Sequence, residues 1–320
     1  MSSTTKIWII IAFILIITGM VLFAGLMFKN NFNFSALDTT AYVTNTYNIT
    51  DDFTKISVTA DTADIDFKLS TDNSCRVVCF EKESATHTVN IQNGALVITY
   101  NRPQSIKDTF SFINVNSPKI TVYLPNKEYG ELVIKGTTSD VNLPKSFSFE
   151  SITIKATTSD VECRSSVTDF INIELTTGDV ALENITANNI NITSSTGDIE
   201  AENINCKDFS FTATTGEAEF ENIKCENLNS SATTGDITAE NCIASGTFSI
   251  VRDTGDVTLK HSDAAEFFMK TTTGDVMGSI NTPKIFITKT DTGRINVPSS
   301  VTGGKCEITT DTGDKKIIVL

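Results

Sequence analysis

Apolar and polar residues alternate in short stretches along most of this chain, and the alternation restarts with a fixed period. A variant of Thr-Thr-Gly-Asp-Val occurs ten times between Thr137 and Asp314, with successive copies 19 or 20 residues apart. A period in this range is typical of solenoids and other stacked arrays. The glycine position of the motif is taken in turn by Ser139, Ser159, Gly178, Gly197, Gly216, Gly235, Gly255, Gly274, Gly293 and Gly313.

One repeat unit, residues 170–185, shows what each copy buries. Ile171, Ile173 and Leu175 alternate with polar residues before the motif, and Val180 and Leu182 do so after it. Period-two alternation indicates strands with one buried face. Counted from the glycine position, the predicted buried offsets are −7, −5, −3, +2, +4 and about +7, and other copies keep them. Each unit is therefore predicted to be two short strands joined by a tight turn.

A unit of this size cannot bury its apolar face alone, so we expect the units to stack in parallel and form internal ladders. A coil of 19 or 20 residues leaves room for only two or three strands in the cross-section. Crossover connections between parallel strands are right-handed in nearly all proteins. The sequence therefore predicts an all-β right-handed parallel β-helix, or solenoid, of about ten coils.

The N-terminal segment has a different pattern, an uncharged run of 22 residues from Ile7 to Phe28, flanked by Lys6 and Lys29. This length is sufficient to span a bilayer as one transmembrane α-helix. A cleaved signal peptide is the alternative, but the run is long for one and no Ala-x-Ala site follows it. Positive charges on the two sides nearly balance. The short tail before the run and the long acidic domain after it favour a single-pass protein whose C-terminal domain is extracellular.

These patterns divide the chain into five parts. We expect a short tail at 1–6, the transmembrane helix at 7–28, a juxtamembrane linker at 29–45, irregular β coils with an N-terminal cap at 46–130, and regular repeats at 131–320. Within the cap, Asn93-Gly94 between two alternating stretches predicts a hairpin with a type I′ turn, and residues 61–65 look like a degenerate motif copy. At the other end, the segment 315–320 begins with two lysines and ends apolar without an evident cap, so its free strand edge predicts end-to-end self-association.

The charge balance excludes some partners. The chain has 25 Lys and Arg against 39 Asp and Glu, a formal net charge of −14, and no basic cluster interrupts it. Nucleic-acid binding requires basic stripes that neutralise phosphates. We therefore expect no nucleic-acid partner, and contact with the membrane only through residues 7–28.

An acidic residue follows the motif glycine in most copies, at offset +1, and these side chains are predicted to point outward in one column. A Ca²⁺ ladder is one interpretation, because extracellular Ca²⁺ sites can be weak and share carboxylates. The alternative is that each Asp caps its own turn, since one carboxylate per coil offers few oxygens. The candidate Ca²⁺ ligands are Asp179, Asp198, Asp236, Asp256 and Asp275.

The sequence assigns no catalytic residue. Three Asp-Thr-Gly triplets, at residues 253–255, 291–293 and 311–313, lie in register with the other motif copies and are interpreted as variants of the motif. The two histidines, His87 and His261, lie in unrelated segments, whereas carbohydrate-active β-helices gather acids and bases in one groove. Arg252 occupies offset −3, where other copies have small residues. A carbohydrate or phosphate anchor, a local register shift and a partner among nearby acids such as Asp253 are the alternatives there.

Seven cysteines leave at least one thiol unpaired. Cys206 and Cys225 share offset +9, so they are predicted to stack on adjacent coils within reach of a disulfide. Cys163 and Cys242 fall at buried offsets and are expected to be small core residues. Cys75 and Cys79 have no second cysteine pair near them in sequence, which disfavours a zinc site there.

A strand-rich lead-in, the strand Ile120-Thr-Val-Tyr-Leu-Pro125 and the repeated motif together resemble the bacterial β-strand-repeat family of putative adhesins, also called toastrack domains. The resemblance covers residues 46–320 and implies a parallel β-helix on the cell surface, often behind a membrane anchor, with no established catalytic residues or cofactor. We expect a non-enzymatic binding or scaffolding role at the cell envelope, with cell-wall glycan or an envelope protein as partner. The alternatives are a sensory or scaffold domain of an envelope-stress system and, less favoured, a carbohydrate-active enzyme.

Overall fold

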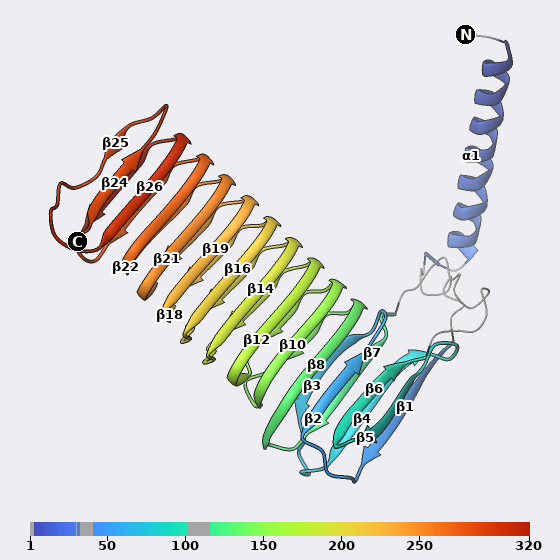
Figure 1. Ribbon diagram of the computed structural model, residues 1–320. Coiled ribbons are helices and arrows are strands. Elements are labelled where there is room, and N and C mark those ends of the chain that lie inside the picture. The colour runs from blue at the N-terminus through green and yellow to red at the C-terminus, as the bar shows by residue number, and fades with distance from the viewer. Residues whose placement is uncertain (1–2, 30, 33–40, 102–115) are drawn as a thin grey trace.

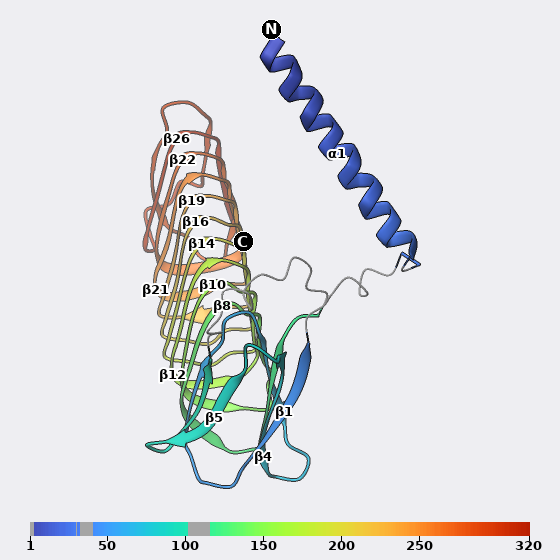
Figure 2. The same ribbon diagram turned by 90° about the vertical axis from the view of Figure 1, so that its right-hand side faces the viewer.

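The computed structural model describes residues 3–29, 31–32, 41–101 and 116–320. Beyond one N-terminal helix it is all β, and the chain forms a β-solenoid of about nine turns (Figure 1). Figure 2 shows the coils stacked behind one another with a narrow cross-section. Each of the ten motif copies lies at a turn that joins a strand of one sheet to a strand of the other. The predicted solenoid is therefore confirmed, with two main sheets that we call sheet A and sheet B.

In sheet A the strands follow the solenoid axis in an order that departs from chain order at both ends. From the N-terminal end they are β1 (Tyr42–Ile49), β4 (Cys75–Lys82), β7 (Lys119–Leu124), β3 (Asp64–Leu69), β9 (Val141–Leu143), β11 (Val161–Cys163), β13 (Val180–Glu183), β15 (Ile199–Glu202), β17 (Ala218–Glu221), β20 (Ile237–Glu240), the first part of β22 (Val257–Thr273), β23 (Val276–Ile280), β27 (Lys315–Val319) and β25 (Ile295–Asn296).

Sheet B lies opposite and supplies the strand before each motif turn. Its order is β5 (His87–Gln92), β6 (Ala95–Tyr100), β2 (Lys55–Thr59), β8 (Glu128–Thr138), β10 (Ser148–Thr158), β12 (Ser166–Thr177), β14 (Asn189–Thr196), β16 (Asp208–Thr215), β19 (Asn227–Thr234), β21 (Ile243–Thr254), the second part of β22, β26 (Lys305–Thr312) and β24 (Ile285–Lys289). A short third strand, β18 (Lys224–Cys225), pairs with the start of β21.

The core between the sheets is built from ladders of equivalent residues. At offset −7, for example, every residue from Leu132 to Cys306 along the stack is at most 1% exposed and pairs with its neighbour on the next coil. The same burial holds at offset +7, where Ile185, Ile204 and Ile223 lie inside. Stacking identical offsets removes apolar surface from water at each coil, which is the main stabilising contribution in solenoids.

The motif glycine is required because consecutive coils approach closely at the turn. Gly178 has a φ of 131°, and a Cβ built on it would lie 2.0 Å from the carbonyl oxygen of Ser159 on the preceding coil. Gly197 repeats the contact with Gly178, at 1.9 Å. In these coils no side chain fits in such a gap, and positive φ is accessible to glycine at low cost. The first two copies have Ser139 and Ser159 at this position, neither with a positive φ, and the Ser159 hydroxyl donates to the carbonyl of Ser139 at 2.5 Å. The turn therefore selects glycine through both backbone conformation and space.

The corner after each sheet-A strand in the middle of the stack is formed by asparagine. Asn184, Asn203, Asn222 and Asn241 have φ values between 52° and 57°, in the left-handed region that asparagine tolerates. Their side chains bond along the stack, with the Nδ2 of Asn203 donating to the Oδ1 of Asn184 at 3.2 Å. The series ends at His261, which occupies the same position with a φ of 50°.

The first coil of the solenoid is not at the end of the stack. Strands β2 and β3 lie between the coil of β6 and β7 on one side and the coil of β8 and β9 on the other. Strands β1, β4 and β5 pair antiparallel beyond β7 and β6 and close this end. The predicted hairpin is confirmed, because β5 and β6 pair across Asn93 and Gly94, which both have positive φ. The degenerate motif copy is also confirmed, since Ile65 pairs with Val141.

The C-terminal end shows the same exchange, which corrects the expectation that residues 315–320 form the exposed last coil. Strands β26 and β27 lie between the coil of β22 and β23 and the coil of β24 and β25. The open end of the stack is therefore β24 and β25, where Ile285, Ile287 and Ile295 are 42%, 51% and 48% exposed. Self-association through a free edge stays a prediction, and the free edge belongs to these strands.

The N-terminal helix α1 spans Ser3–Lys29, and its segment Thr5–Lys29 is long and apolar enough to cross a membrane. A signal sequence meets the same criterion. Most of the predicted linker at 29–45 lies outside the described residues, and β1 begins within it, at Tyr42.

All seven cysteines are free thiols. Cys163 and Cys242 are fully buried, as predicted for core residues. Cys206 and Cys225 lie on adjacent coils and contact each other through their thiols; this contact, followed by burial, raises the pKa of Cys225.

Candidate functional site

The outer face of sheet A is acidic because its outward offsets are +1, +3 and +5. The inward residues at +2 and +4 are buried, for example Ile199 and Ala201. Side chains of a strand alternate between faces, so the residues between them point to solvent. Carboxylates occupy many of these outward positions, and they form three parallel columns along the stack.

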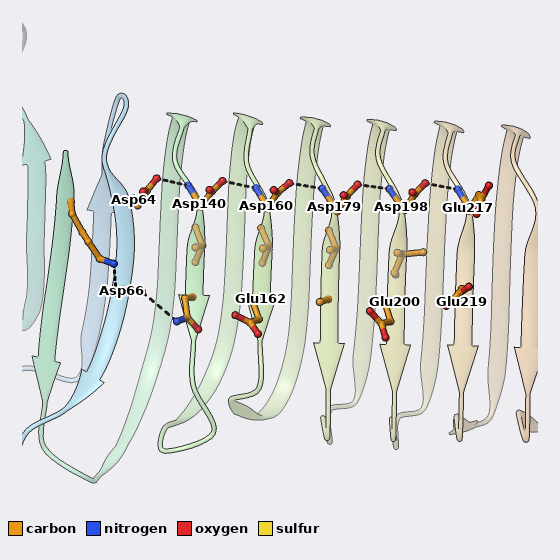
Figure 3. Close-up of a pocket in the computed structure, with 17 residues that line it drawn as sticks. Asp64, Asp66, Asp140, Asp160, Glu162, Asp179, Asp198, Glu200, Glu217 and Glu219 are labelled. Atoms are coloured by element: carbon orange, nitrogen blue, oxygen red, sulfur yellow. Dashed lines mark hydrogen bonds and ion pairs between the residues drawn. The ribbon is translucent and has the colours of Figure 1, made fainter. Parts of the chain in front are cut away.

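The first column, at offset +1, is a ladder of hydrogen bonds between coils (Figure 3). The backbone N–H of Asp160 donates to the Oδ1 of Asp140 at 2.9 Å, and Asp179 donates to Asp160 in the same way, also at 2.9 Å. The ladder continues through Asp198 and Glu217 at 2.8 Å per step. It resumes between Asp236, Asp256, Asp275 and Asp314, and it ends where the N–H of Arg294 donates to Asp314 at 2.7 Å.

This ladder corrects the expectation that each Asp caps its own turn. The carboxylate accepts from the next coil, because the N–H at offset +1 points back toward the preceding coil while the neighbouring N–H groups, such as that of Val161, donate forward. Within the described residues one step is missing, from Asp236 to Glu217. We attribute this to the extra methylene of Glu217, which carries its carboxylate past the amide.

The structure brings the five proposed Ca²⁺ ligands into this column but not into one continuous series. Asp179 and Asp198 are separated by Glu217 from Asp236, Asp256 and Asp275. The Oδ1 atoms of Asp179, Asp198, Asp236 and Asp256 each accept a backbone N–H, so their second oxygens are what remains for a cation. A Ca²⁺ ladder stays a prediction.

The second and third columns, at offsets +3 and +5, were not predicted from the sequence. The alternation in residues 198–202 and 217–221 already signals them, since acids there flank the inward residues. These two adjacent coils carry three carboxylates each, all at least partly exposed: Asp198, Glu200, Glu202, Glu217, Glu219 and Glu221. The motif alone indicates one carboxylate per coil, which offers few oxygens to Ca²⁺. For this part of the face that count is too low.

Cations border this face without entering its centre. At the N-terminal side the Nζ of Lys119 lies 2.6 Å from Asp66, and Arg164 pairs with Glu162 and Glu183. At the C-terminal side Lys260 lies 3.3 Å from Glu240. The two coils between these borders keep their carboxylates without a described ion pair, so negative potential concentrates there.

A shallow groove of about 570 Å³ runs along the N-terminal half of the face. Ten of its 17 lining residues are Asp or Glu, and one is a lysine, Lys119. Burial raises the pKa of Asp64 at one end of the groove, while the N–H of Asp140, which donates to it at 3.4 Å, acts in the opposite direction. The groove is an extended anionic surface with one rung of charge per coil.

Arg252 is a core residue, and the structure shows neither an external anchor nor a register shift at this position. It is in register with Ala232 and Thr271, and it is fully buried. Its guanidinium donates to the carbonyl of Gly235 at 3.0 Å, the carbonyl of Val251 at 2.9 Å and the hydroxyl of Ser230 at 2.9 Å. Its side chain therefore binds the solenoid's own turn, away from any external ligand.

The remaining candidates are dispersed. His261 lies at the asparagine corner, and His87 lies in the N-terminal cap and does not line the groove. Of the three Asp-Thr-Gly triplets, those of Asp291 and Asp311 fall on adjacent coils, where the N–H of Asp291 donates to the carbonyl of Asp311. Both side chains are exposed, and the described residues show no contact between the two carboxyl groups.

A family model described as Toastrack DUF4097 matches residues 53–318. The chain belongs to this family. The match covers most of the chain, including both exchanged ends of the solenoid and the whole acidic face. Among proteins of curated function, no significant match is found.

Solved structures share the toastrack fold at low sequence identity. A putative adhesin from Parabacteroides merdae is 15% identical, with 75% of this chain and 97% of that chain covered and a TM-score of 0.50. A putative adhesin from Bacteroides fragilis is 18% identical, with 88% and 99% covered and a TM-score of 0.46. A putative lipid binding protein from Parabacteroides distasonis is 21% identical, with 76% and 97% covered and a TM-score of 0.48. None of these three toastrack neighbours is named as an enzyme.

Proposed function

We propose that this toastrack chain is a membrane-anchored extracellular binding protein, without catalytic activity, whose acidic face engages a cationic partner at the cell envelope. The observation that carries the proposal is the pair of adjacent coils with six carboxylates and no described ion pair among them. Such a charge pattern favours a partner with several positive groups spaced along an extended segment.

The lining of the groove supports binding over catalysis. The described residues that line it include no histidine, cysteine or serine. Carboxylates can serve as acids, bases and nucleophiles, but those at offset +1 repeat from coil to coil and accept the backbone N–H of the next coil, so no acid–base pair is set apart. The names of the fold neighbours, putative adhesins and a putative lipid binding protein, are also those of binding proteins. An exposed segment of a basic envelope protein, or a glycan bearing free amines, has the required chemistry.

The strength of the interaction would come from repetition. A strand spacing of about 4.8 Å brings each rung of carboxylates within one residue or so of the next along an extended partner. Single exposed ion pairs contribute roughly 0–1 kcal/mol each. Several such contacts on one rigid face raise the effective concentration for the next contact, so a weak single contact becomes useful binding.

The test uses the full-length protein in detergent with a fluorescent decalysine peptide and an uncharged peptide of equal length. In the variant that we call the groove variant, Glu200 and Glu219 of the groove and Glu202 and Glu221 of the adjoining column at offset +5 become Gln. In the matched control, four exposed acids away from the groove, Glu128, Glu150, Glu226 and Glu266, become Gln. We expect at least a tenfold loss of decalysine affinity for the groove variant and less than twofold for the control. Equal losses in both variants would contradict a specific groove.

A second arm distinguishes a polymeric cation from a metal. Calorimetric titration with Ca²⁺ at millimolar concentration tests the predicted ladder, and absence of heat removes it.

Protease treatment of intact cells, followed by an antibody against the repeats, tests the location. Digestion supports the extracellular assignment, and protection until lysis would contradict both the location and the adhesin-like role.

A further inference from the structure

Three buried side chains with metal-binding atoms meet in the N-terminal cap, on strands β4 and β5. Cys79 and Glu81 lie two residues apart on β4 and therefore face the same side. His87 is the first residue of β5 and reaches them across a short turn. One ligand atom from each of the three lies within 4.8 Å of the other two. Cys79 and Glu81 are fully buried, and His87 is 4% exposed.

The carboxylate of Glu81 is held in place by its surroundings. Its Oε2 lies 2.7 Å from the Nδ1 of His87 and accepts the backbone N–H of His87, also at 2.7 Å. Its Oε1 accepts the side-chain amide of Asn45 on β1 at 2.6 Å. Tyr47, also on β1, fixes the start of β5 by donating its hydroxyl to the carbonyl of His87 at 2.9 Å. The cluster is thus held in place by side chains of one neighbouring strand, β1.

The imidazole of His87 is incompletely satisfied. Its Nε2 is buried and has no hydrogen-bond partner among the described residues. Buried polar atoms are nearly always paired, so each exception calls for an explanation. The protein gives the ring one partner for two nitrogens, which is the arrangement expected where a further group binds.

A catalytic Cys–His–Glu triad does not explain the cluster. Burial raises the pKa of Cys79 to about 12, with the negative charge of Glu81 adding to the shift. The thiol is therefore protonated at neutral pH, and a protonated thiol is a poor nucleophile. The three side chains are also shielded from solvent, so a substrate has no access to them.

We propose that Cys79, Glu81 and His87 form a zinc site that clamps β4 of sheet A to β5 of sheet B. A thiolate, a carboxylate and an imidazole are the usual zinc ligands, and a fourth position remains for water or another donor. Zn²⁺ with one thiolate and one carboxylate carries no net charge, which suits a buried position. On binding, the Cys79 thiol loses its proton to solvent as the Zn–S bond forms.

The geometry requires only a small adjustment. Bond lengths of about 2.0–2.3 Å at a tetrahedral ion place ligand atoms roughly 3.4–3.6 Å apart. The 4.8 Å limit on the cluster allows this separation. Coordination through Nδ1 would open its 2.7 Å separation from Oε2 by about 0.7 Å and leave Nε2 without a partner, whereas coordination through the unpaired Nε2 would keep the bond between Nδ1 and Oε2. Asn45 would remain on the second carboxylate oxygen and orient the ligand, as outer-sphere partners do in zinc proteins.

The test uses the full-length protein in detergent, stripped with a chelator and titrated with Co²⁺ and then Zn²⁺. We expect one Co²⁺ per chain, visible and near-ultraviolet absorption bands of a tetrahedral thiolate complex, and bleaching of those bands by Zn²⁺. X-ray absorption of the zinc-loaded wild type should show one sulfur scatterer at about 2.3 Å and the remaining ligands at about 2.0–2.2 Å. Absence of stoichiometric Co²⁺ binding, or a zinc shell without sulfur, overturns the proposal.

Matched variants assign the ligands. Cys79→Ser should abolish the thiolate band, whereas Cys163→Ser, at an equally buried cysteine of the regular stack, should keep it. His87→Gln and Glu81→Gln should weaken Co²⁺ binding at least 100-fold, and His261→Gln should leave it unchanged. Asn45→Ala should weaken it about tenfold, as loss of an outer-sphere partner does. A thiolate band that persists in Cys79→Ser overturns the assignment, and the wild-type absorption spectrum decides the matter if a buried variant does not fold.

Discussion

The first six motif copies and the last four share one backbone but differ inside it at offset −3. The first six place small or apolar residues there, except for Ser194, which bonds within its own coil. The last four place Arg252, Thr271, Thr290 and Thr310 there, and each donates to the carbonyl of a turn glycine. The coil of β2 and β3, with the buried Ala60 at this offset, belongs with the first group.

This difference shows that a polar residue inside a solenoid need not mark a ligand site. The interior at offset −3 lies directly beneath the turn, so a donor there can reach a carbonyl of the backbone. Arg252 then belongs to the same class as Thr271 and Thr310, with a longer side chain that also reaches Ser230 on the neighbouring coil. The C-terminal coils replace part of their apolar packing with hydrogen bonds to the turn.

If offset −3 is the main difference, the glycine position should be equally intolerant in both groups. A Cβ at Gly178 would meet the carbonyl oxygen of Ser159 at 2.0 Å, and one at Gly274 would meet that of Gly255 at 2.1 Å. We expect Gly178→Ala and Gly274→Ala each to lower the free energy of unfolding by about 3 kcal/mol or more, measured by chemical denaturation. Gly130→Ala is the control, because its nearest neighbour would be 3.4 Å away. Unequal losses would mean that the two groups differ in their turns as well.

The next largest effect is expected when Arg252 is replaced by alanine, which several coils of the first group have at offset −3. Arg252→Ala leaves a cavity and removes three hydrogen bonds. We expect a loss of about 2–3 kcal/mol in the free energy of unfolding. Arg252→Thr, which imitates Thr271, should recover about 1 kcal/mol of it. If Arg252→Ala and Arg252→Thr are equally stable, the threonine hydroxyl does not bond to the turn. Arg252 would then not belong to the same class as Thr271 and Thr310.

Titration of Arg252 gives the comparison a pH signature. Burial lowers its pKa to about 10, and the nearby Asp236 opposes this shift. The folded state then binds fewer protons than the unfolded state between the folded pKa and the ordinary value of 12.5, so stability contributed by this group rises with pH in that window. The stability difference between wild type and Arg252→Ala should therefore increase above pH 10. A difference independent of pH would indicate that the guanidinium is solvated.

A smaller effect is expected at Thr271, which is 1% exposed and donates to the carbonyls of Gly255 and Thr273 at 3.1 Å each. Thr271→Val keeps the shape and removes the donor, so we expect a loss of about 1 kcal/mol in thermal or chemical unfolding. Thr272→Val, at the exposed neighbouring position, serves as the control and should change stability by less than about 0.5 kcal/mol. Similar losses of stability in the two variants would show that the hydrogen bond from Thr271 to the turn does not contribute to stability.

The smallest effect extends the comparison to the coil of β2 and β3. Burial raises the pKa of Asp64, so its charged form is disfavoured in the folded state and costs stability at neutral pH. Asp64→Asn keeps an oxygen for the N–H of Asp140, and we expect a slight gain in stability at pH 7. The gain should disappear as the pH falls through the folded pKa, which denaturation curves at several pH values would show. A gain that persists in acid would have another cause.

The sequence predicts the regular part of the fold well because each coil is specified by its own pattern. The inward offsets of residues 170–185 follow from alternation, and the exposed asparagine corner and motif turns follow from local backbone preferences. The acids at +1 are visible in the motif. Those at +3 and +5 follow from the same alternation, and counting outward offsets in residues 198–202 would have revealed the denser face.

The sequence does not predict the order of coils at the two ends. The spacing from Gly274 to Gly293 and on to Gly313 stays at 19 and 20 residues, although the last coil lies between the other two. Coils with the same buried offsets fit one another in any order, so the pattern carries no information about which neighbours pair. The cluster of Cys79, Glu81 and His87 could not be predicted for a related reason. The three residues meet because β5 begins beside the end of β4, and the sequence pattern does not show how these two strands are placed.

The exchanged end coils also determine how the molecule responds to force. A terminal strand with one neighbour peels away one hydrogen bond at a time, but β27 is paired with β23 on one side and β25 on the other. A pull on the last described strand therefore loads two rows of hydrogen bonds at once. The first strand, β1, pairs with β4 alone, so a pull from the side of helix α1 meets a single row. We expect mechanical unfolding of the stack to begin at β1 and not at β27.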